Sequence, residues 1–306
     1  MDLLINKIIA KQNPTVVGLD PQWDFIPDEI KQKYISDDRP TLDEICKAVL
    51  EFNKRIISAI CSIVPAVKPN CAFYEQLGWR GMKVLHETIE FAISKGLYVI
   101  ADGKRNDIGS TMKSYANAYI GETVIDNLTF RAFPADALTV NAYLGSDGII
   151  PTTDICEGLD KDIFVLVKTS NPSSGEFQDK DLRLGHIPVY KHVALMCKKW
   201  GQDLLGHYNY SSIGIVVGAT YPEQLKQLRD MLPNTFFLVP GYGAQGGSIE
   251  DIRYAFSSSG LGAIINSSRA IMCAYKKYPD LSFDEACFKE VSKMKKDILS
   301  VIGRVG

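Results

Sequence analysis

The sequence has no large excess of charge of either sign. Its 306 residues include 34 Lys and Arg against 36 Asp and Glu, which gives a net charge of −2 at pH 7. A protein that binds nucleic acid in general needs a basic surface, because the phosphate backbone supplies most of the affinity. General nucleic-acid binding is therefore excluded as the main function, although a local anion pocket is compatible with this balance.

Long apolar runs and paired cysteines are also missing. No stretch approaches the roughly 18 apolar residues of a membrane span, and the apolar run at the N-terminus is too short for a signal peptide. The seven cysteines are odd in number and none has CxxC spacing, which argues against a disulfide framework or a zinc knuckle. We expect a soluble cytoplasmic protein with reduced thiols and no membrane partner.

Histidine is scarce, and the four that occur lie away from the ends of the predicted strands: His86, His186, His192 and His207. A histidine base, a Ser-His-Asp triad and a histidine-rich metal site are therefore not expected. No Walker A loop is present either. The remaining candidates use lysine, carboxylates and a phosphorylated substrate.

What the chain does contain is a series of short apolar runs that recur over its whole length. Several are continuous rather than alternating, which is typical of parallel strands buried on both faces. The predicted strands are 15–20, 66–70, 98–104, 137–142, 163–170, 212–220, 235–240 and 262–267.

Segments with helical spacing separate these strands. Eight strand–helix units in about 300 residues predict a (β/α)8 barrel, formed by residues 1–306 as a single α/β domain. A doubly wound open sheet is the main rival, because alternation alone does not separate the two. The long segments 21–65 and 171–211 predict inserted helices, and 171–185 is either a lid or a solvated connector.

The strongest signal for function lies in residues 98–108, where an apolar run ends in Asp102, Lys104 and Asp107. In a barrel the active site forms at the carboxyl ends of the strands. Two other predicted strands end in Asp20 and in Lys68. We expect these five side chains to form one network of alternating charge, in which each charge stabilises its neighbour.

A second group of residues indicates a phosphate site. Residues 240–248 place four glycines after the seventh strand and before a helix expected to begin near Ser248, and glycine allows backbone N–H groups to approach an anion. The eighth strand is followed by Arg269, which is suited to two-pronged phosphate binding. The loops after strands seven and eight often bind phosphate in this fold.

A lysine beside two carboxylates could form an imine, donate a proton or share the site with a metal ion. A nucleophilic lysine needs desolvation or nearby cations. Carboxylates should instead hold Lys104 in its protonated form, and Lys104 would repel a divalent ion from the same space. These arguments favour a proton donor that also stabilises a developing anion.

Over essentially its whole length the chain resembles the orotidine 5′-phosphate decarboxylase family, particularly its longer, type 2 group of bacterial and protozoan-like members. The resemblance rests on the pattern Asp-x-Lys-x-x-Asp at 102–107 and on five further motifs in the same order. These are Gly18-Leu-Asp-Pro21, Val67-Lys-Pro-Asn70, Lys168-Thr-Ser-Asn171, Pro240-Gly-Tyr-Gly-Ala-Gln-Gly-Gly247 and Asn266-Ser-Ser-Arg269.

The resemblance implies decarboxylation of orotidine 5′-phosphate to UMP, without a metal or organic cofactor. Lys104 would protonate the C6 carbanion that remains when carbon dioxide leaves. Asp102 would lie beside the substrate carboxylate, and Lys68 would complete the charged network. Asp107 and Thr111 would enter the active site of a partner subunit, because the family builds its sites across a homodimer interface.

The resemblance also implies how the rest of the substrate is bound. Asp20 and Lys68 would bind the ribose hydroxyls with Asn70 nearby, Ser170 would contact the pyrimidine, and Pro240 would line the base pocket. The phosphate would be held by Gln245, Gly246, Gly247 and Arg269.

Two alternatives remain open at this point. One is a Mg-dependent 3-keto-sugar-phosphate decarboxylase of the same suprafamily, for which Glu75 and Glu176 are weak candidates as additional metal ligands. The other is a non-catalytic nucleotide-binding barrel.

Overall fold

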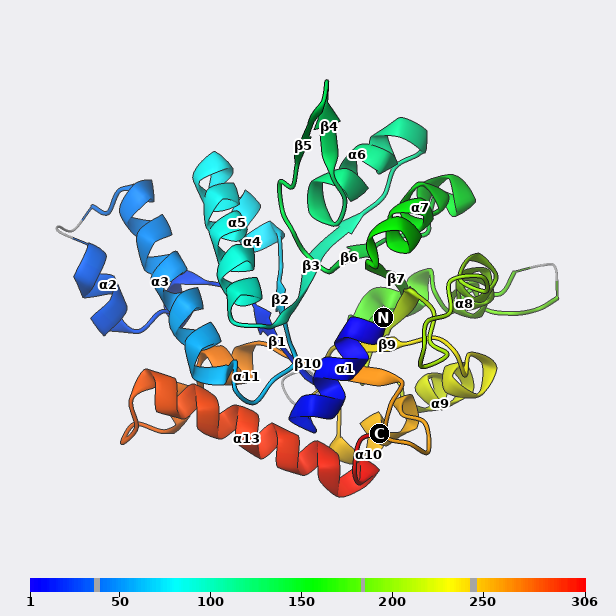
Figure 1. Ribbon diagram of the computed structural model, residues 1–306. Coiled ribbons are helices and arrows are strands. Elements are labelled where there is room, and N and C mark those ends of the chain that lie inside the picture. The colour runs from blue at the N-terminus through cyan, green and yellow to red at the C-terminus, as the bar shows by residue number, and fades with distance from the viewer. Residues whose placement is uncertain (36–38, 183–184, 243–246) are drawn as a thin grey trace.

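The structure is a computed structural model that describes residues 1–35, 39–182, 185–242 and 247–306. Eight parallel strands close into a barrel in the order β1-β10-β9-β8-β7-β6-β3-β2 (Figure 1). The strands are β1 (Thr15–Leu19), β2 (Ala66–Pro69), β3 (Tyr98–Arg105), β6 (Ala137–Val140), β7 (Asp162–Lys168), β8 (Ile213–Val217), β9 (Phe237–Val239) and β10 (Ala263–Ser267). All eight predicted strands are confirmed, and because the sheet is closed the open-sheet alternative is wrong.

The continuous apolar strands are buried on both faces, as the sequence predicted. In β7, Ile163 and Val165 face the layer between the barrel and its helices. Phe164 lies between them in sequence and packs in the barrel interior. Successive side chains of a strand point to opposite faces, so a strand with two buried faces needs apolar residues at consecutive positions.

Helices surround the barrel, and among the described residues none is long and apolar enough to cross a membrane. The longer ones are α3 (Leu42–Ile60), α5 (Gly78–Ser94), α6 (Gly109–Tyr119), α7 (Ile150–Leu159), α8 (Val189–Trp200), α9 (Pro222–Met231) and α13 (Phe283–Ile302). The shorter ones are α2 (Asp28–Tyr34), α4 (Ala72–Glu75), α10 (Ile249–Ile252), α11 (Arg269–Met272) and α12 (Ala274–Lys277).

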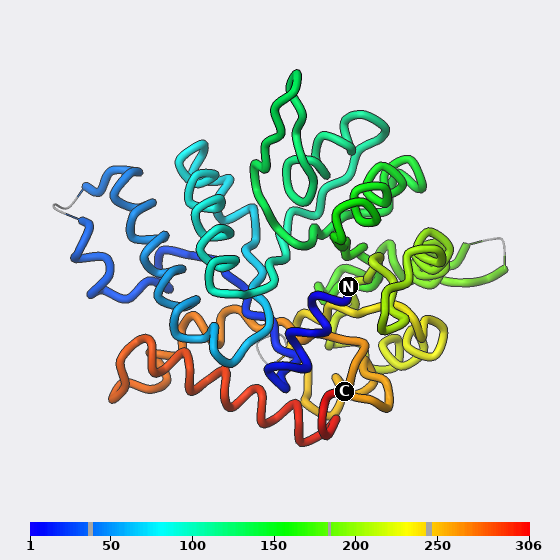
Figure 2. Tube along the Cα trace, viewed as in Figure 1, coloured from blue at the N-terminus to red at the C-terminus, as the bar shows by residue number. Residues whose placement is uncertain are grey.

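The amino-terminal end of the barrel is covered by α1 (Asp2–Lys11). Leu4, Ile5 and Ile8 of this helix are fully buried and pack with the inward-facing strand residues. The end of α1 lies beside the C-terminal end of the chain, where Gln12 Nε2 donates to the Val305 carbonyl at 2.7 Å (Figure 2). This closure leaves the opposite end of the barrel for a site.

One element was not predicted from the sequence. After α6 the chain forms an antiparallel hairpin of β4 (Thr123–Ile125) and β5 (Leu128–Phe130), which projects beside α6 (Figure 1). Its apolar side chains are unusually exposed, by 49 to 64%: Val124, Ile125, Leu128 and Phe130. The runs are too short for periodicity to distinguish them from a loop.

Candidate active site

A cavity of about 700 Å³ opens at the carboxyl ends of the strands. It is lined by residues of all eight barrel strands or of the segments directly after them, as the barrel prediction requires. The predicted site residues that line it are Asp20, Lys68, Asn70, Asp102, Lys104, Ser170, Pro240 and Arg269. Residues that are 249 positions apart in sequence therefore share one chamber.

The centre of this cavity is a pair of ion pairs that share one carboxylate. Lys68 Nζ lies 2.5 Å from Asp102 Oδ2, and Lys104 Nζ lies 2.6 Å from Asp102 Oδ1. Lys68 and Asp102 are 5% and 8% exposed, whereas the Lys104 side chain is 47% exposed. Lys104 is therefore the cation that reaches into the cavity, and the other two residues form its buried support.

Mutual attraction outweighs burial in this group. Burial opposes ionisation of Asp102, but the charges of Lys68 and Lys104 hold the pKa of its carboxyl well below its usual range. Burial would also lower the pKa of Lys68, but the negative charges of Asp102 and Asp20 raise it above its ordinary value. Both groups are therefore charged at neutral pH.

Replacing Asp102 by Ala should destabilise the fold, because Lys68 would remain buried without its ion-pair partner. We expect the free energy of unfolding to fall by about 3–5 kcal/mol at pH 7. Because the pKa of Asp102 is depressed, its contribution is complete above the unfolded carboxyl pKa of about 3.9 and is lost as the pH falls toward the folded pKa. Urea unfolding of both proteins should therefore give a constant difference between pH 6 and 8, and a variant as stable as the parent would contradict this role.

The backbone at these residues departs from the regular strand assumed from the sequence. Ala101 pairs with Leu138 and Arg105 pairs with Val140, so three residues of β3 lie opposite one residue of β6. Lys104 has φ of +48°, in the left-handed region that side chains other than glycine rarely adopt. Lys104 therefore lies beside Asp102 because β3 bulges here, and not because of the two-residue alternation of a regular strand.

The predicted five-residue network is only partly present within one chain. Asp20 influences Lys68 through its charge, but Asp107 and Thr111 do not line the cavity. Asp107 Oδ1 instead accepts a hydrogen bond from the Ile108 N–H at 2.8 Å, just before α6. Among the described residues Lys104 forms an ion pair with Asp102 and none with Asp107, so the expected network within one chain lacks Asp107.

The phosphate end of the cavity contains Arg269, the first residue of α11. A side chain at Gly18 would lie 1.8 Å from Ser268 Oγ, so glycine is required for β1 to approach the segment that carries Arg269. The helix expected near Ser248 begins there, but α10 has only four residues, and a capping box engages the N–H groups of Ser248 and Asp251. The helix dipole therefore contributes less to anion binding here than we expected from the sequence.

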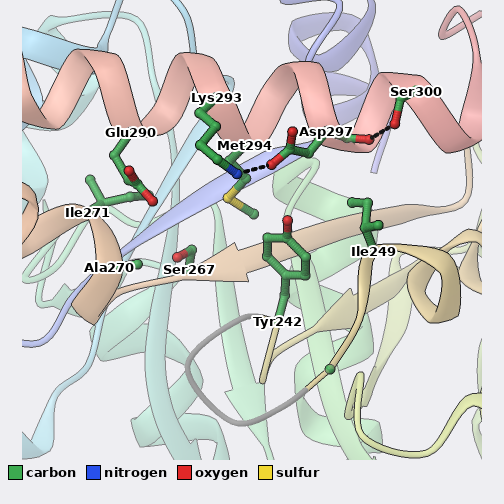
Figure 3. A pocket seen from close by; sticks show the side chains of 11 residues that line it. Tyr242, Ile249, Ser267, Ala270, Ile271, Glu290, Lys293, Met294, Asp297 and Ser300 are labelled. Atoms are coloured by element: carbon green, nitrogen blue, oxygen red, sulfur yellow. Dashed lines mark hydrogen bonds and ion pairs between the residues drawn. The ribbon is translucent and has the colours of Figure 1, made fainter. Parts of the chain in front are cut away.

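Three other positions were predicted to bind the phosphate. Gln245 and Gly246 are outside the described residues. Gly247 lines a second cavity, of about 510 Å³, between α13 and the segment after β9. Figure 3 shows the Tyr242 ring pointing from that segment toward α13, where Lys293 pairs with Asp297. Tyr242 and Ser267 line both cavities, so the two adjoin at this corner.

The segment after β7 forms one wall of the main cavity, to which Gln178 contributes. Lys168, which is fully buried, donates to both oxygens of Asp179 at 2.8 and 2.9 Å. The Gln178 carboxamide accepts from the Thr169 N–H at 2.9 Å and donates to its hydroxyl at 2.7 Å. These bonds tie residues 178–179 to the end of β7.

Sequence reasoning assigned no role to several polar residues of the cavity. Thr139 and Asn266 line it, and Asn266 Oδ1 is buried without a hydrogen bond to any residue described. Thr139 Oγ1 donates to Asp102 Oδ1 at 2.9 Å. Both lie near the carboxyl ends of strands, which is the signal that could have found them.

The glycines after β9 also have a spacing found in another class of site. Gly241, Gly243 and Gly246 have the G-x-G-x-x-G spacing of a dinucleotide-binding turn. That motif follows the first strand of an open βαβ sheet. Here it follows β9 in a closed barrel, so the spacing does not indicate a dinucleotide site.

Comparisons with known proteins agree with this geometry. A sequence model of the family described as orotidine 5′-phosphate decarboxylase / HUMPS matches residues 15–278. An orotidine 5′-phosphate decarboxylase of Caldicellulosiruptor bescii is 43% identical over 301 residues, 98% of each chain. One from Rhodopirellula baltica is 44% identical over 270 residues, which cover 88% of this chain and 87% of that one. The solved OMP decarboxylase of Leishmania donovani superposes with a TM-score of 0.72 at 29% identity, covering 98% and 97% of the two chains.

Proposed function

The chain belongs to the orotidine 5′-phosphate decarboxylase family, and we propose that Lys68, Asp102 and Lys104 carry out its chemistry. It is a carboxy-lyase that forms UMP from orotidine 5′-phosphate in pyrimidine biosynthesis. The observation that supports this assignment is the shared carboxylate of Asp102, which holds two lysines at 2.5 and 2.6 Å. Both lysines line the cavity, but the Lys104 side chain is 47% exposed and that of Lys68 only 6%.

In the proposed reaction the bond between C6 and the carboxylate of the substrate breaks, and its electron pair stays on C6. The Lys104 ammonium stabilises this carbanion and then transfers a proton from Nζ to C6, which gives UMP and carbon dioxide. Asp102 lies beside the leaving carboxylate, disfavours the bound ground state and holds the Lys104 ammonium by its ion pair. Lysine regains its proton from water.

The remaining substrate contacts are proposed from the resemblance to the family, together with the position of those residues that the structure describes. Asp20 and Lys68 lie near each other and would bind ribose hydroxyls, with Asn70 beside them. Ser170 and Pro240 line the wall where the pyrimidine would lie. Arg269 at the other end would bind the phosphate together with Gln245, Gly246 and Gly247.

Replacing Arg269 by Ala should chiefly weaken substrate binding. A charge-assisted two-pronged bond is worth about 1.5–3 kcal/mol, so KM should rise roughly 10- to 150-fold. Arg269→Lys keeps the charge without the fork and should fall between the parent and the alanine variant. Steady-state kinetics would measure this, and an unchanged KM in Arg269→Ala would contradict the phosphate assignment.

The magnesium-dependent alternative is not favoured. The relatives matched over nearly the whole chain are orotidine 5′-phosphate decarboxylases. Neither Glu75 nor Glu176, the two candidate additional ligands, lines the cavity. Glu75 pairs instead with Arg105.

The deciding assay adds orotidine 5′-phosphate to the purified protein in the presence of EDTA and follows the change in ultraviolet absorbance as UMP forms. We expect full turnover without metal. Activity that EDTA abolishes and Mg²⁺ restores would support the magnesium-dependent reading. Binding of UMP without any turnover of orotidine 5′-phosphate would support the non-catalytic barrel.

We further propose a homodimer in which Asp107 and Thr111 enter the partner's cavity. Two observations support it: neither residue lines the cavity of its own chain, and the nearby surface is apolar. Ile108 is 53% exposed, and the hairpin that follows α6 exposes its four apolar side chains. A patch of this kind is typical of an interaction surface.

Two further expectations remain proposals. A single domain from 1 to 306 is supported by α1, which covers the barrel floor, and by α13, whose side chains pack in the same core as those of α3. A cytoplasmic location is supported by the seven cysteines, all of which are free thiols.

A further inference from the structure

Thr139 lies at the centre of the irregularity in β3. It is the single residue of β6 opposite Asp102, Gly103 and Lys104, between the pairs Ala101–Leu138 and Arg105–Val140. Its side chain is buried, with the residue 1% exposed. Any group that determines the shape of this bulge also determines where Lys104 Nζ lies.

The Thr139 hydroxyl makes two hydrogen bonds, one to each end of the bulge. The Lys104 N–H donates to Thr139 Oγ1 at 2.9 Å, and Thr139 Oγ1 donates to Asp102 Oδ1 at 2.9 Å. The directions are fixed by chemistry, because an amide N–H only donates and an ionised carboxylate only accepts. The one hydroxyl proton must therefore point at Asp102.

This arrangement holds a backbone conformation that is otherwise unfavourable. Lys104 has φ of +48°, and a residue with a Cβ pays a steric cost in that region. Such a conformation persists only when its surroundings fix it. The hydrogen bond from the Lys104 N–H to Thr139 is one such restraint, and the ion pair of Lys104 Nζ with Asp102 Oδ1 is another.

We propose that Thr139 is a positioning residue for the decarboxylation, whose hydroxyl fixes the left-handed backbone of Lys104 and the orientation of the Asp102 carboxylate together. The inference rests on the proposed role of Lys104 as proton donor. Thr139 would act through these two residues rather than on the substrate. A single hydroxyl then sets the distance between the donated proton and C6.

The test compares four substitutions at two positions in the full-length protein. Thr139→Val keeps the β-branched shape and removes the hydroxyl, whereas Thr139→Ser and Thr139→Ala lack the methyl group and differ from each other only in the hydroxyl. Thr15→Val is the matched control, since Thr15 is a fully buried barrel residue whose hydroxyl has no hydrogen-bond partner among the residues described.

We expect kcat to fall roughly 10- to 100-fold in Thr139→Val, because small misplacements of a reacting group are costly. Thr139→Ser should retain kcat within about 5-fold of the parent, since it keeps both hydrogen bonds. KM and the Kd for UMP by calorimetry should change little in Thr139→Val, as the binding groups are intact. Thr15→Val should keep the parent kcat.

Two results would overturn the proposal. One is a parent-like kcat in Thr139→Val. The other is equal kcat in Thr139→Ser and Thr139→Ala, a comparison that still decides the matter if the valine variant does not fold. A fully active Lys104→Ala variant is a separate result, which would contradict the proton donor itself and not the measured effect of the hydroxyl.

Discussion

Replacing Lys104 by Ala should reduce kcat by at least about 10⁴-fold, because one change removes both a general acid and a fixed positive charge. The substitution takes away the only lysine of the Lys68–Asp102–Lys104 group whose side chain is substantially exposed in the cavity. Lys68 cannot replace it, since its Nζ is buried against Asp102 Oδ2. The measurement is turnover of orotidine 5′-phosphate at saturating substrate.

Binding should survive this change. The proposed ribose and phosphate contacts do not involve Lys104, so calorimetry should still detect UMP. Lys198→Ala, which removes an exposed lysine on α8, is the matched control and should keep the parent kcat. If Lys104→Ala retained a tenth of the parent kcat, Lys104 would not be the proton donor.

Mixing two inactive variants should restore activity if the site is shared between subunits. Lys104→Ala and Asp107→Ala each lose a necessary group, but a mixed dimer contains one site with an intact Lys104 and an intact Asp107. Random exchange makes about half of the dimers mixed, each with one intact site of two, so the mixture should reach about a quarter of the parent activity. The measurement is the turnover of orotidine 5′-phosphate after equal amounts of the two variants are mixed.

The physical basis is the position of Asp107 at the start of α6. Asp107 does not line the cavity of its own chain, and it directly precedes Ile108, which is exposed. Subunit exchange must be confirmed separately, for example with differently tagged copies. If activity does not recover although subunits exchange, Asp107 does not contribute to the partner's site. The control mixes Lys104→Ala with Asp102→Ala. Both residues belong to the site of their own chain, so this mixture should stay inactive.

The barrel was predictable because each of its strands carries its own signal. Runs such as Ile163–Val167 are continuous and apolar, and such runs occur where both faces of a strand are buried. Closure brings the carboxyl ends of these strands together, so Asp20, Lys68, Asp102 and Arg269 could be assigned to one site before any distance was known. The hairpin β4–β5 carried no such signal, because its two runs have three residues each.

The sequence by itself determined which segments form the barrel and which residues could form its site. The apolar runs predict the strands, Asp102 and Lys104 lie at the end of one strand, and Arg269 follows the last. The tertiary structure decided how they act on one another. Lys68 shares the Asp102 carboxylate with Lys104, Asp107 lies outside its own chain's cavity, and a buried threonine from the neighbouring strand holds the bulge. Spacing along the chain encodes a local period, whereas ion pairs across strands depend on register and backbone shape, which are set only when the barrel closes.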